Sequence, residues 1–351
     1  MKFKYFLILL ILPFLLQAQN RPFRVGTTTA SFLEIGYGSA GASMGDAYVS
    51  MARDISSIYW NPAGLAFMEQ SEAQFVIQPW IVDISTSFAA AGIVLPEIGT
   101  VALGLTFTDY GEMDVNTVEN PYGTGERFSS GDFALSLAYG RALTDWFGFG
   151  VAAKYIQSNI WHLDASALAV DLGVSINTAF FSPTGDRVDG MRIAMSISNY
   201  GTRMKFDGID LLQSIDPLPD QDGDYGNVPG KYDPNEWELP LIFRLGVAVN
   251  AFRTESQRLT IATDALHPNN NAESVNVGGE YEYFEPTIGK FFLRAGYKGL
   301  FLNEDQAEFG HTFGAGFEKL VMGNISLKVD YAFRDMGILG KVNSYSIGFL
   351  F

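Results

Sequence analysis

The sequence predicts an all-β protein, a transmembrane antiparallel β-barrel of about 14 strands with a small N-terminal helical hatch. The first observation is the C-terminal run, in which Tyr345, Ile347, Phe349 and Phe351 alternate with smaller residues. In a strand these four side chains share one face, and such a face suits lipid. The second is that no later segment offers the about 20 consecutive apolar residues of a membrane-spanning helix. A half-buried strand of a soluble sandwich would also alternate. The patterns of the remaining strands therefore decide between a transmembrane barrel and a soluble sandwich.

The N-terminus predicts export from the cytoplasm. Lys2 and Lys4 precede an apolar run over residues 6–16, and Gln17-Ala18-Gln19 offers a cleavage site. This order of a basic start, an apolar core and small residues is typical of a secretory signal peptide. We therefore expect residues 1–19 to be a signal peptide.

Composition supports an exported β protein. The chain has 37 Gly, 28 Phe, 16 Tyr and no Cys, so disulfides contribute nothing to its stability. The net charge is -16, and loss of Lys2 and Lys4 with the signal peptide would make it -18. Such an acidic balance disfavours a nucleic-acid partner.

The mature chain divides into an N-terminal segment with a hatch, residues 20–71, and a barrel, residues 72–351. The barrel region contains fourteen segments with strand character, an even number as closed bacterial barrels require. They are 72–80, 83–95, 100–110, 132–144, 146–159, 165–177, 191–206, 239–253, 257–267, 273–285, 290–301, 308–320, 323–335 and 342–351.

Alternation within these segments assigns one face to lipid and the other to the lumen. Leu168, Val170 and Leu172 alternate with small or charged residues, as expected for lipid outside and a polar lumen inside. Seven basic and five acidic residues fall on the lumen face, and this mixed set suits pairing and gripping a plug better than the single-signed ring of an ion-selective pore. The predicted lumen-facing charges are Lys154, Asp171, Arg192, Arg244, Asp264, Glu280, Arg294, Lys298, Glu318, Lys328, Asp330 and Arg334.

The hatch is predicted over residues 36–68, which are rich in Gly, Ala and Ser and can pack closely in a confined space. A short helix is expected over residues 42–53. Pro62 should block helix continuation and push Asn61 into an extended conformation. The predicted hatch-motif residues are Gly41, Gly45, Asp46, Asp54, Asn61, Pro62, Ala63 and Gly64.

Two stretches carry a resemblance to a known family. Residues 41–47 (GASMGDA) and 54–66 (DISSIYWNPAGLA) resemble the N-terminal hatch of FadL-like outer-membrane proteins, and more closely the PorV/PorQ branch. Residues 264–271, 277–281, 293–298, 312–316 and 329–333 support that branch. The resemblance implies a fourteen-stranded barrel with an internal hatch in the outer membrane of a Gram-negative-type cell.

The resemblance implies two alternative functions. PorV-like members take part in type IX protein secretion, which would make the partners a translocon or exported cargo proteins besides outer-membrane lipid. FadL-like members move hydrophobic small molecules. A structural or assembly role for the barrel is a third possibility, and fold alone does not separate the three.

The segment 207–239 is predicted to be a long extracellular loop, with Tyr225 and Trp237 as partner contacts or membrane-interface residues. Asp220, Asp222 and Asp224 have a spacing that could bind calcium, but the glutamate of an EF-hand is missing. A solvated acidic loop is the simpler interpretation.

The sequence predicts neither an enzyme nor a cofactor or zinc site. Residues 41–45 fit the G-x-S-x-G pattern, yet the strand-turn-helix context and the following Asp and His of a hydrolase are missing. The three histidines, His162, His267 and His311, have no zinc-like spacing.

Overall fold

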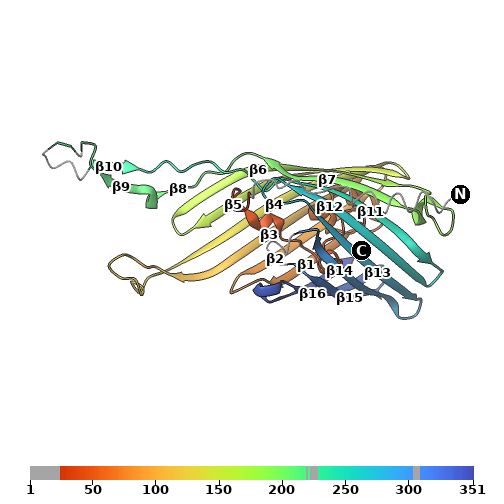
Figure 1. Cartoon of the computed structure of the whole chain (residues 1–351). Helices are drawn as coiled ribbons and strands as arrows, with labels where there is room; N and C mark the ends of the chain where they lie inside the picture. The colour runs from red at the N-terminus through yellow and green to blue at the C-terminus, as the bar shows by residue number, and fades with distance from the viewer. Residues whose placement is uncertain (1–23, 219, 222–227, 303–308) are drawn as a thin grey trace.

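The computed structural model describes residues 24–218, 220–221, 228–302 and 309–351. Its main body is a closed antiparallel barrel of fourteen strands, which confirms the predicted fold class (Figure 1). The predicted signal peptide, residues 1–19, lies outside the described residues. The barrel strands are β1 (Glu72–Pro79), β2 (Ser85–Leu95), β3 (Gly99–Asp114), β4 (Arg127–Thr144), β5 (Phe147–Ile160), β6 (Leu163–Asn177), β7 (Arg192–Gly201), β11 (Ile242–Arg253), β12 (Gln257–Pro268), β13 (Ser274–Glu285), β14 (Gly289–Leu300), β15 (His311–Met322), β16 (Ile325–Asp335) and β17 (Lys341–Leu350).

The barrel closes because its first and last strands pair. β1 runs antiparallel to β17, with Phe75 opposite Ile347, and every other barrel strand pairs with its neighbours along the chain. The C-terminal alternation that first indicated a barrel therefore lies in the closing strand. Closure leaves no open sheet edge, as a sheet in a membrane requires.

The two mouths of the barrel differ in the length of their connections. At the mouth where β1 begins and β17 ends, strands are joined by short turns such as 96–98, 254–256 and 286–288. One longer connection, 178–191, also lies at this mouth. The other mouth, at the left of Figure 1, carries 115–126 and the longest connection, 202–241. Short periplasmic turns and longer extracellular loops are the rule for outer-membrane barrels, so we assign the first mouth to the periplasm and the second to the outside.

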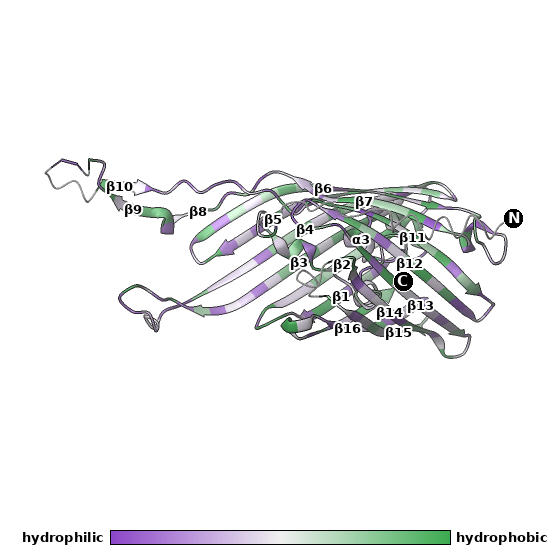
Figure 2. Cartoon of the chain, viewed as in Figure 1, coloured by the Kyte–Doolittle hydropathy of each residue, from purple (hydrophilic) through white to green (hydrophobic). Residues whose placement is uncertain are grey.

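The outer face of the strands is apolar. Leu103, Leu172, Leu293 and Phe349 are 47–61% exposed, whereas their strand neighbours Ala102, Asp171 and Arg294 are buried. Hydrophobic and hydrophilic residues alternate along the strands in Figure 2. In a membrane this exposed apolar surface is covered by lipid. Among the described residues, no helix has the length and apolarity to cross a bilayer.

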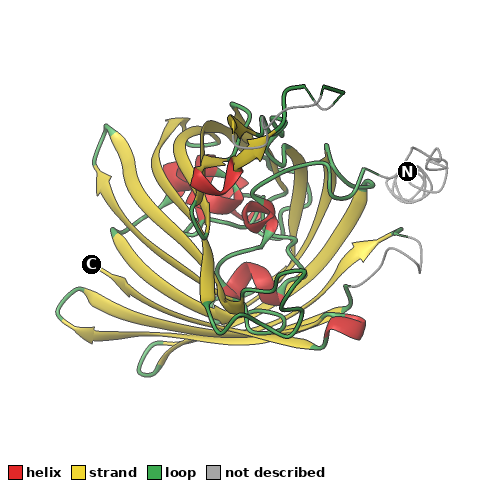
Figure 3. Cartoon of the chain, turned by 90° about the vertical axis from the view of Figure 1, so that its left-hand side faces the viewer, coloured by secondary structure: helices red, strands yellow, loops and turns green. Residues whose placement is uncertain are grey.

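The N-terminal segment lies inside the barrel (Figure 3). It contains η2 (Ser31–Glu34), α2 (Ser39–Ser43), α3 (Ser57–Trp60) and η3 (Pro62–Phe67). The predicted helix over residues 42–53 is wrong, because α2 ends at Ser43. Gly45 and Asp46 follow with φ of +65° and +63°, a left-handed conformation that stops a helix.

Three small strands lie in the long extracellular connection. β8 (Asp207–Gly208) adds to the end of β6, and β9 (Leu212–Ile215) pairs with β10 (Val228–Lys231) as a separate two-stranded sheet. The short helices η4 (Arg187–Asp189), η5 (Ile209–Leu211) and η6 (Gly337–Leu339) lie in connections between strands.

Candidate functional site

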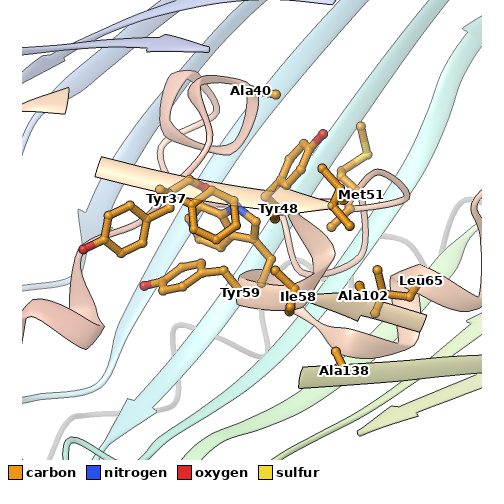
Figure 4. Close-up of a cluster of buried hydrophobic side chains, with 14 of the residues drawn as sticks. Tyr37, Ala40, Tyr48, Met51, Ile58, Tyr59, Leu65, Ala102 and Ala138 are labelled. Atoms are coloured by element: carbon orange, nitrogen blue, oxygen red, sulfur yellow. The ribbon is translucent and has the colours of Figure 1, made fainter. Parts of the chain in front are cut away.

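An aromatic cluster forms the centre of the hatch (Figure 4). Tyr37, Tyr48, Tyr59 and Trp60 are buried, and the Trp60 ring meets Tyr59 edge to face with a centroid distance of 5.0 Å. The Trp60 indole N–H donates to the Tyr37 carbonyl at 2.8 Å, which satisfies its polar atom inside the cluster. This hydrophobic core is continuous with wall residues such as Phe88, whose ring stacks on Tyr37 at a centroid distance of 5.8 Å.

Glycines on the inward face of the barrel leave room for the hatch backbone. A Cβ atom at Gly150 would lie 2.1 Å from the Pro62 carbonyl carbon, and one at Gly173 would lie 1.9 Å from Asn61 Oδ1. On the opposite side, Gly278 and Gly296 approach the backbone of Met44 in the same way. Strand glycines often mark such a close approach. The wall and the hatch are thus shaped for one another.

The predicted corner at Asn61 and Pro62 fixes the hatch to the wall. Asn61 is extended (φ -164°, ψ 106°), and its side-chain oxygen caps η3 by accepting the Ala63 N–H at 3.0 Å. Its amide nitrogen donates to the carbonyls of Val49 and Val174, and Val174 belongs to β6. Because Asn61 is fully buried, replacing it would leave these polar groups without partners.

Gly41 and Gly64 act through packing inside the hatch, whereas a Cβ atom at Gly45 would lie 2.7 Å from the Tyr297 backbone nitrogen of β14. Gly41 lies against the Trp60 ring, and a Cβ atom at Gly64 would lie 2.2 Å from the Ala52 carbonyl oxygen. Ser43, between Gly41 and Gly45, is buried, and its hydroxyl donates to the Ala40 carbonyl at 2.8 Å.

Asp46 joins the hatch to two strands on the extracellular side of the barrel. Its carboxylate pairs with Lys298 at 2.7 Å and with Arg334 at 3.2 Å. Burial by itself raises the pKa of Asp46, but Arg334 and Lys298 outweigh it and hold the pKa below its usual value of 3.8. Arg334 also donates to the Gly36 carbonyl at 2.9 Å.

Asp54 makes the corresponding link toward the periplasm. It pairs with Lys328 of β16 at 2.6 Å and accepts from the Ser56 backbone N–H at 3.1 Å. Burial raises its pKa, and the effect of Lys328 outweighs burial, so the pKa lies below 3.8. Nearby, the Ile55 N–H donates to Glu72 Oε2 at 3.0 Å. The hatch is anchored at both ends by charge-assisted contacts.

Asp264 and Arg244 hold the hatch from β12 and β11. Asp264 is fully buried and accepts the Val49 N–H at 2.8 Å. Arg244 donates to Ser198 at 3.0 Å and lies over the Tyr59 ring.

The remaining lumen charges pair mainly along the wall. Arg294 binds Glu280 at 2.7 Å and Asp330 at 2.6 Å, and Lys154 binds Asp171 at 2.6 Å. Glu318 pairs with Lys290 at 2.8 Å. Arg192 instead donates to the Met51 sulfur at 3.0 Å. The twelve predicted charges thus divide into wall pairs, hatch anchors and Arg192.

The extracellular connection forms a second candidate site, the β9–β10 hairpin with its flanks, residues 204–237. Trp237 is 45% exposed, and its backbone pairs with Met204 at the base of the hairpin. Tyr225 lies outside the described residues. Ile209, Leu212, Val228 and Tyr232 are exposed apolar or aromatic side chains that sequence reasoning did not single out.

Three acidic residues of this connection are the candidate calcium ligands. Asp220 belongs to a described turn, while Asp222 and Asp224 lie outside the described residues. The calcium hypothesis therefore stays a prediction.

Sequence reasoning also missed the wall glycines and Arg53. Gly150 and Gly173 lie on inward positions of strands whose alternation was recognised, so inward strand glycine was the available signal. Arg53 donates to Asn177 of β6. Nothing in the local sequence indicated that contact.

Comparisons with known proteins agree with this arrangement. A family model described as type IX secretion system protein PorV matches residues 17–215. No curated protein matches the sequence.

Solved structures of similar fold include a transporter and a channel for aromatic hydrocarbons. The toluene transporter TodX of Pseudomonas putida has a TM-score of 0.52 at 13% identity, covering 90% of this chain and 96% of that chain. The monoaromatic hydrocarbon channel CymD has a TM-score of 0.53 at 10% identity, covering 90% and 96%. A FadL homologue of Pseudomonas aeruginosa has a TM-score of 0.48 at 12% identity, covering 94% and 99%. At 10% and 13% identity, the likeness to TodX and CymD shows a shared fold.

Proposed function

Because the chain belongs to the PorV family of type IX secretion system proteins, we propose that it takes part in type IX protein export by binding or shuttling exported proteins. It is an outer-membrane β-barrel. We assign the protein contact to the β9–β10 hairpin, which projects beyond the extracellular mouth (Figure 1). This projecting apolar surface is the observation that carries the proposal.

The hairpin has the surface of a protein-binding element. Ile209 and Tyr232 are each 63% exposed and Leu212 is 55% exposed, although they lie outside the apolar band of the barrel. Exposed apolar groups gathered outside a membrane favour a partner surface. Aromatic side chains frequently dominate such contacts.

Charged contacts hold the hairpin in position. Lys205 pairs with Asp233, Lys231 pairs with Asp207, and His162 of the neighbouring connection lies 3.0 Å from Asp210. A surface held before binding loses less conformational entropy when a partner arrives.

The interior favours a sealed carrier over the alternative, a channel for hydrophobic compounds. A site for hydrophobic ligands is largely apolar. The cavity at the periplasmic mouth, about 400 Å³, is lined mainly by charged side chains. A second cavity toward the outside is lined by Asp46, Arg244 and Lys298 and by apolar residues such as Ile242 and Leu266. Its volume of about 150 Å³ is smaller than the roughly 300 Å³ at which ligand pockets begin. Between them lies the hatch with its wall glycines.

The test removes the hairpin and keeps its base. Residues 209–231 are replaced by a short Gly-Ser turn, which preserves the backbone pairing of Met204 with Trp237. The tagged barrel is purified gently from its native outer membrane, and co-purifying proteins are identified by mass spectrometry. We expect the intact chain to recover translocon subunits or exported proteins and the shortened chain to lose them.

A second variant provides the control. Shortening the β3–β4 connection, residues 115–126, removes an extracellular loop that also exposes Val118 and Tyr122. This variant should retain the partners. Equal recovery by the intact chain and the 209–231 variant would refute the assignment to the hairpin.

The channel alternative is tested on the same purified material. Recovery of the barrel without protein partners, together with a reproducible hydrophobic compound in solvent extracts, would favour transport. We propose no reaction for this protein and assign it a non-catalytic role.

A further inference from the structure

The cavity at the periplasmic mouth lies between the hatch and the wall. It has a volume of about 400 Å³, and its lining combines hatch residues such as Arg53 and Phe67 with residues of β7, β12, β14 and β16. Seven basic side chains and six acidic ones contribute to the lining. Their ion pairs show which of the basic side chains keep hydrogen-bond donors available for a ligand.

Five of the basic groups have a carboxylate partner. The pairs are Lys328 with Asp54, Arg294 with Glu280, Arg258 with Glu282, Lys290 with Glu318 and Arg253 with Asp189. Among the described residues, Arg53 and Arg192 have no carboxylate within ion-pair distance. Glu69 attracts Arg53 electrostatically but is itself exposed.

Arg192 is held in a position that leaves donors available. It is 5% exposed, its Nη2 donates to the Met51 sulfur at 3.0 Å, and its buried Nε has no hydrogen-bond partner among the described residues. A thioether is a weak acceptor for a guanidinium. Glu280 attracts Arg192 electrostatically, but its ion pairs are with Arg294 and Arg258. A buried cation with so few hydrogen bonds is costly, so an anion in the cavity would stabilise Arg192.

Arg53 brings a second guanidinium to the same place. It donates to Asn177, which lies directly opposite Arg192 in the β6–β7 pair, and its guanidinium lies 5.1 Å from the centre of the Phe67 ring. Burial and then Arg258 lower the pKa of Arg53 to about 10. Three arginines from the hatch, β7 and β12 therefore surround one space.

We propose that Arg53, Arg192 and Arg258, the arginine pocket, bind a phosphate-type oxyanion. Arg53 and Arg192 supply guanidinium donors that no carboxylate among the described residues binds. Glu69 and Glu72 also line the cavity, so the match to an oxyanion lies in these available donors and not in the net charge. The planar donors of arginine suit the oxygens of phosphate in paired hydrogen bonds. The group is either free inorganic phosphate or the phosphate of a lipid headgroup from the periplasmic leaflet, because the cavity lies at that mouth.

The test measures both sources on the full-length barrel. Inorganic phosphate is titrated calorimetrically into protein in phosphate-free detergent, and phosphorus NMR quantifies phospholipid that remains bound after purification. We expect binding either of inorganic phosphate or of phospholipid. Arg192→Gln and Arg53→Gln should each weaken it roughly tenfold or more, since each removes hydrogen bonds from a charged donor.

Arg127→Gln is the matched control, because Arg127 pairs with exposed Glu112 at the extracellular ends of β4 and β3. It should leave binding unchanged. Arg53 belongs to the hatch, so its variant keeps the test valid if Arg192→Gln does not fold, and folding is checked by heat-dependent migration in gels. Binding of neither inorganic phosphate nor phospholipid, or equal binding by all variants, would overturn the proposal.

Discussion

The hatch and the β9–β10 hairpin are both irregular segments of this barrel, yet they treat polar and apolar groups in opposite ways. In the hatch, Trp60 is buried and Asp46 is paired with two cations. In the hairpin, Leu212 and Tyr232 are exposed, and the ion pair of Lys205 with Asp233 is open to water. The hatch has the contacts of a permanent core, whereas the hairpin has the surface of an interface.

This difference indicates that the hatch has a structural role and the hairpin a binding role. A segment fitted against wall glycines and anchored by buried ion pairs stabilises a closed barrel. An exposed hairpin contributes little to the folded barrel and keeps its apolar groups available. Changes in the hatch should therefore alter stability, and changes in the hairpin should alter binding.

The largest effect on stability is expected at Asp46. Asp46→Asn removes one partner from a buried set and leaves Lys298 and Arg334 uncompensated, at a cost of about 3–5 kcal/mol in the free energy of unfolding. Glu112→Gln, which breaks the exposed pair with Arg127, should cost less than about 1 kcal/mol. Denaturant unfolding in detergent micelles measures both. Similar losses for the two variants would contradict a buried anchor.

The second-largest effect on stability is expected at one of two adjacent glycines on β13. A Cβ atom at Gly278 would lie 2.4 Å from the Met44 carbonyl oxygen, whereas at Gly279 the nearest atom is 3.8 Å away. Gly278→Ala should therefore destabilise the barrel by about 1–3 kcal/mol through overpacking. Gly279→Ala should leave the unfolding midpoint nearly unchanged, and equal midpoints for both would argue against a fitted wall.

Acid should weaken the hatch only at low pH. The folded-state pKa values of Asp46 and Asp54 lie below 3.8, so their contribution is fully present above that value and is lost as the pH falls through the folded pKa. The denaturant midpoint should show no loss from these groups between pH 7 and pH 5 and should fall below pH 3.8. An Asp46→Asn, Asp54→Asn double variant should show a smaller fall. A fall at pH 5 to 7 that disappears in this variant would contradict the assigned pKa directions.

The smallest effect on stability is expected in the hairpin. Leu212→Ser changes an exposed side chain, and the free energy of unfolding should move by no more than about 0.5 kcal/mol. Partner recovery from the native membrane should nevertheless fall severalfold. A stability loss as large as that of Gly278→Ala would show that the hairpin belongs to the core.

The strands were predictable because each one carries its own periodic pattern. Leu168, Val170 and Leu172 indicate β6 without reference to any other segment, and all fourteen predicted strands correspond to barrel strands. The predicted and observed strand ends differ where loops begin. For example, the strand predicted over 191–206 corresponds to β7, which ends at Gly201. Local propensity carries no information about where a neighbouring strand stops pairing.

The hatch was predictable only in part. Pro62 and Asn61 behave as expected because proline restricts the preceding residue through local sterics. The helix over 42–53 failed because Asp46 adopts a left-handed conformation where it pairs with Lys298 and Arg334, far away in the sequence. Helix propensity does not include such partners.

The sequence by itself determined the fold class, the strand count, the inward and outward faces and the presence of a hatch. These features depend on alternation, proline and glycine, whose effects act within a few residues. Only the tertiary structure decided which wall glycines receive the hatch, which charges pair, and that Arg53 meets Arg192 beside Asn177. Such contacts depend on barrel closure, which brings distant residues to distances of a few ångströms.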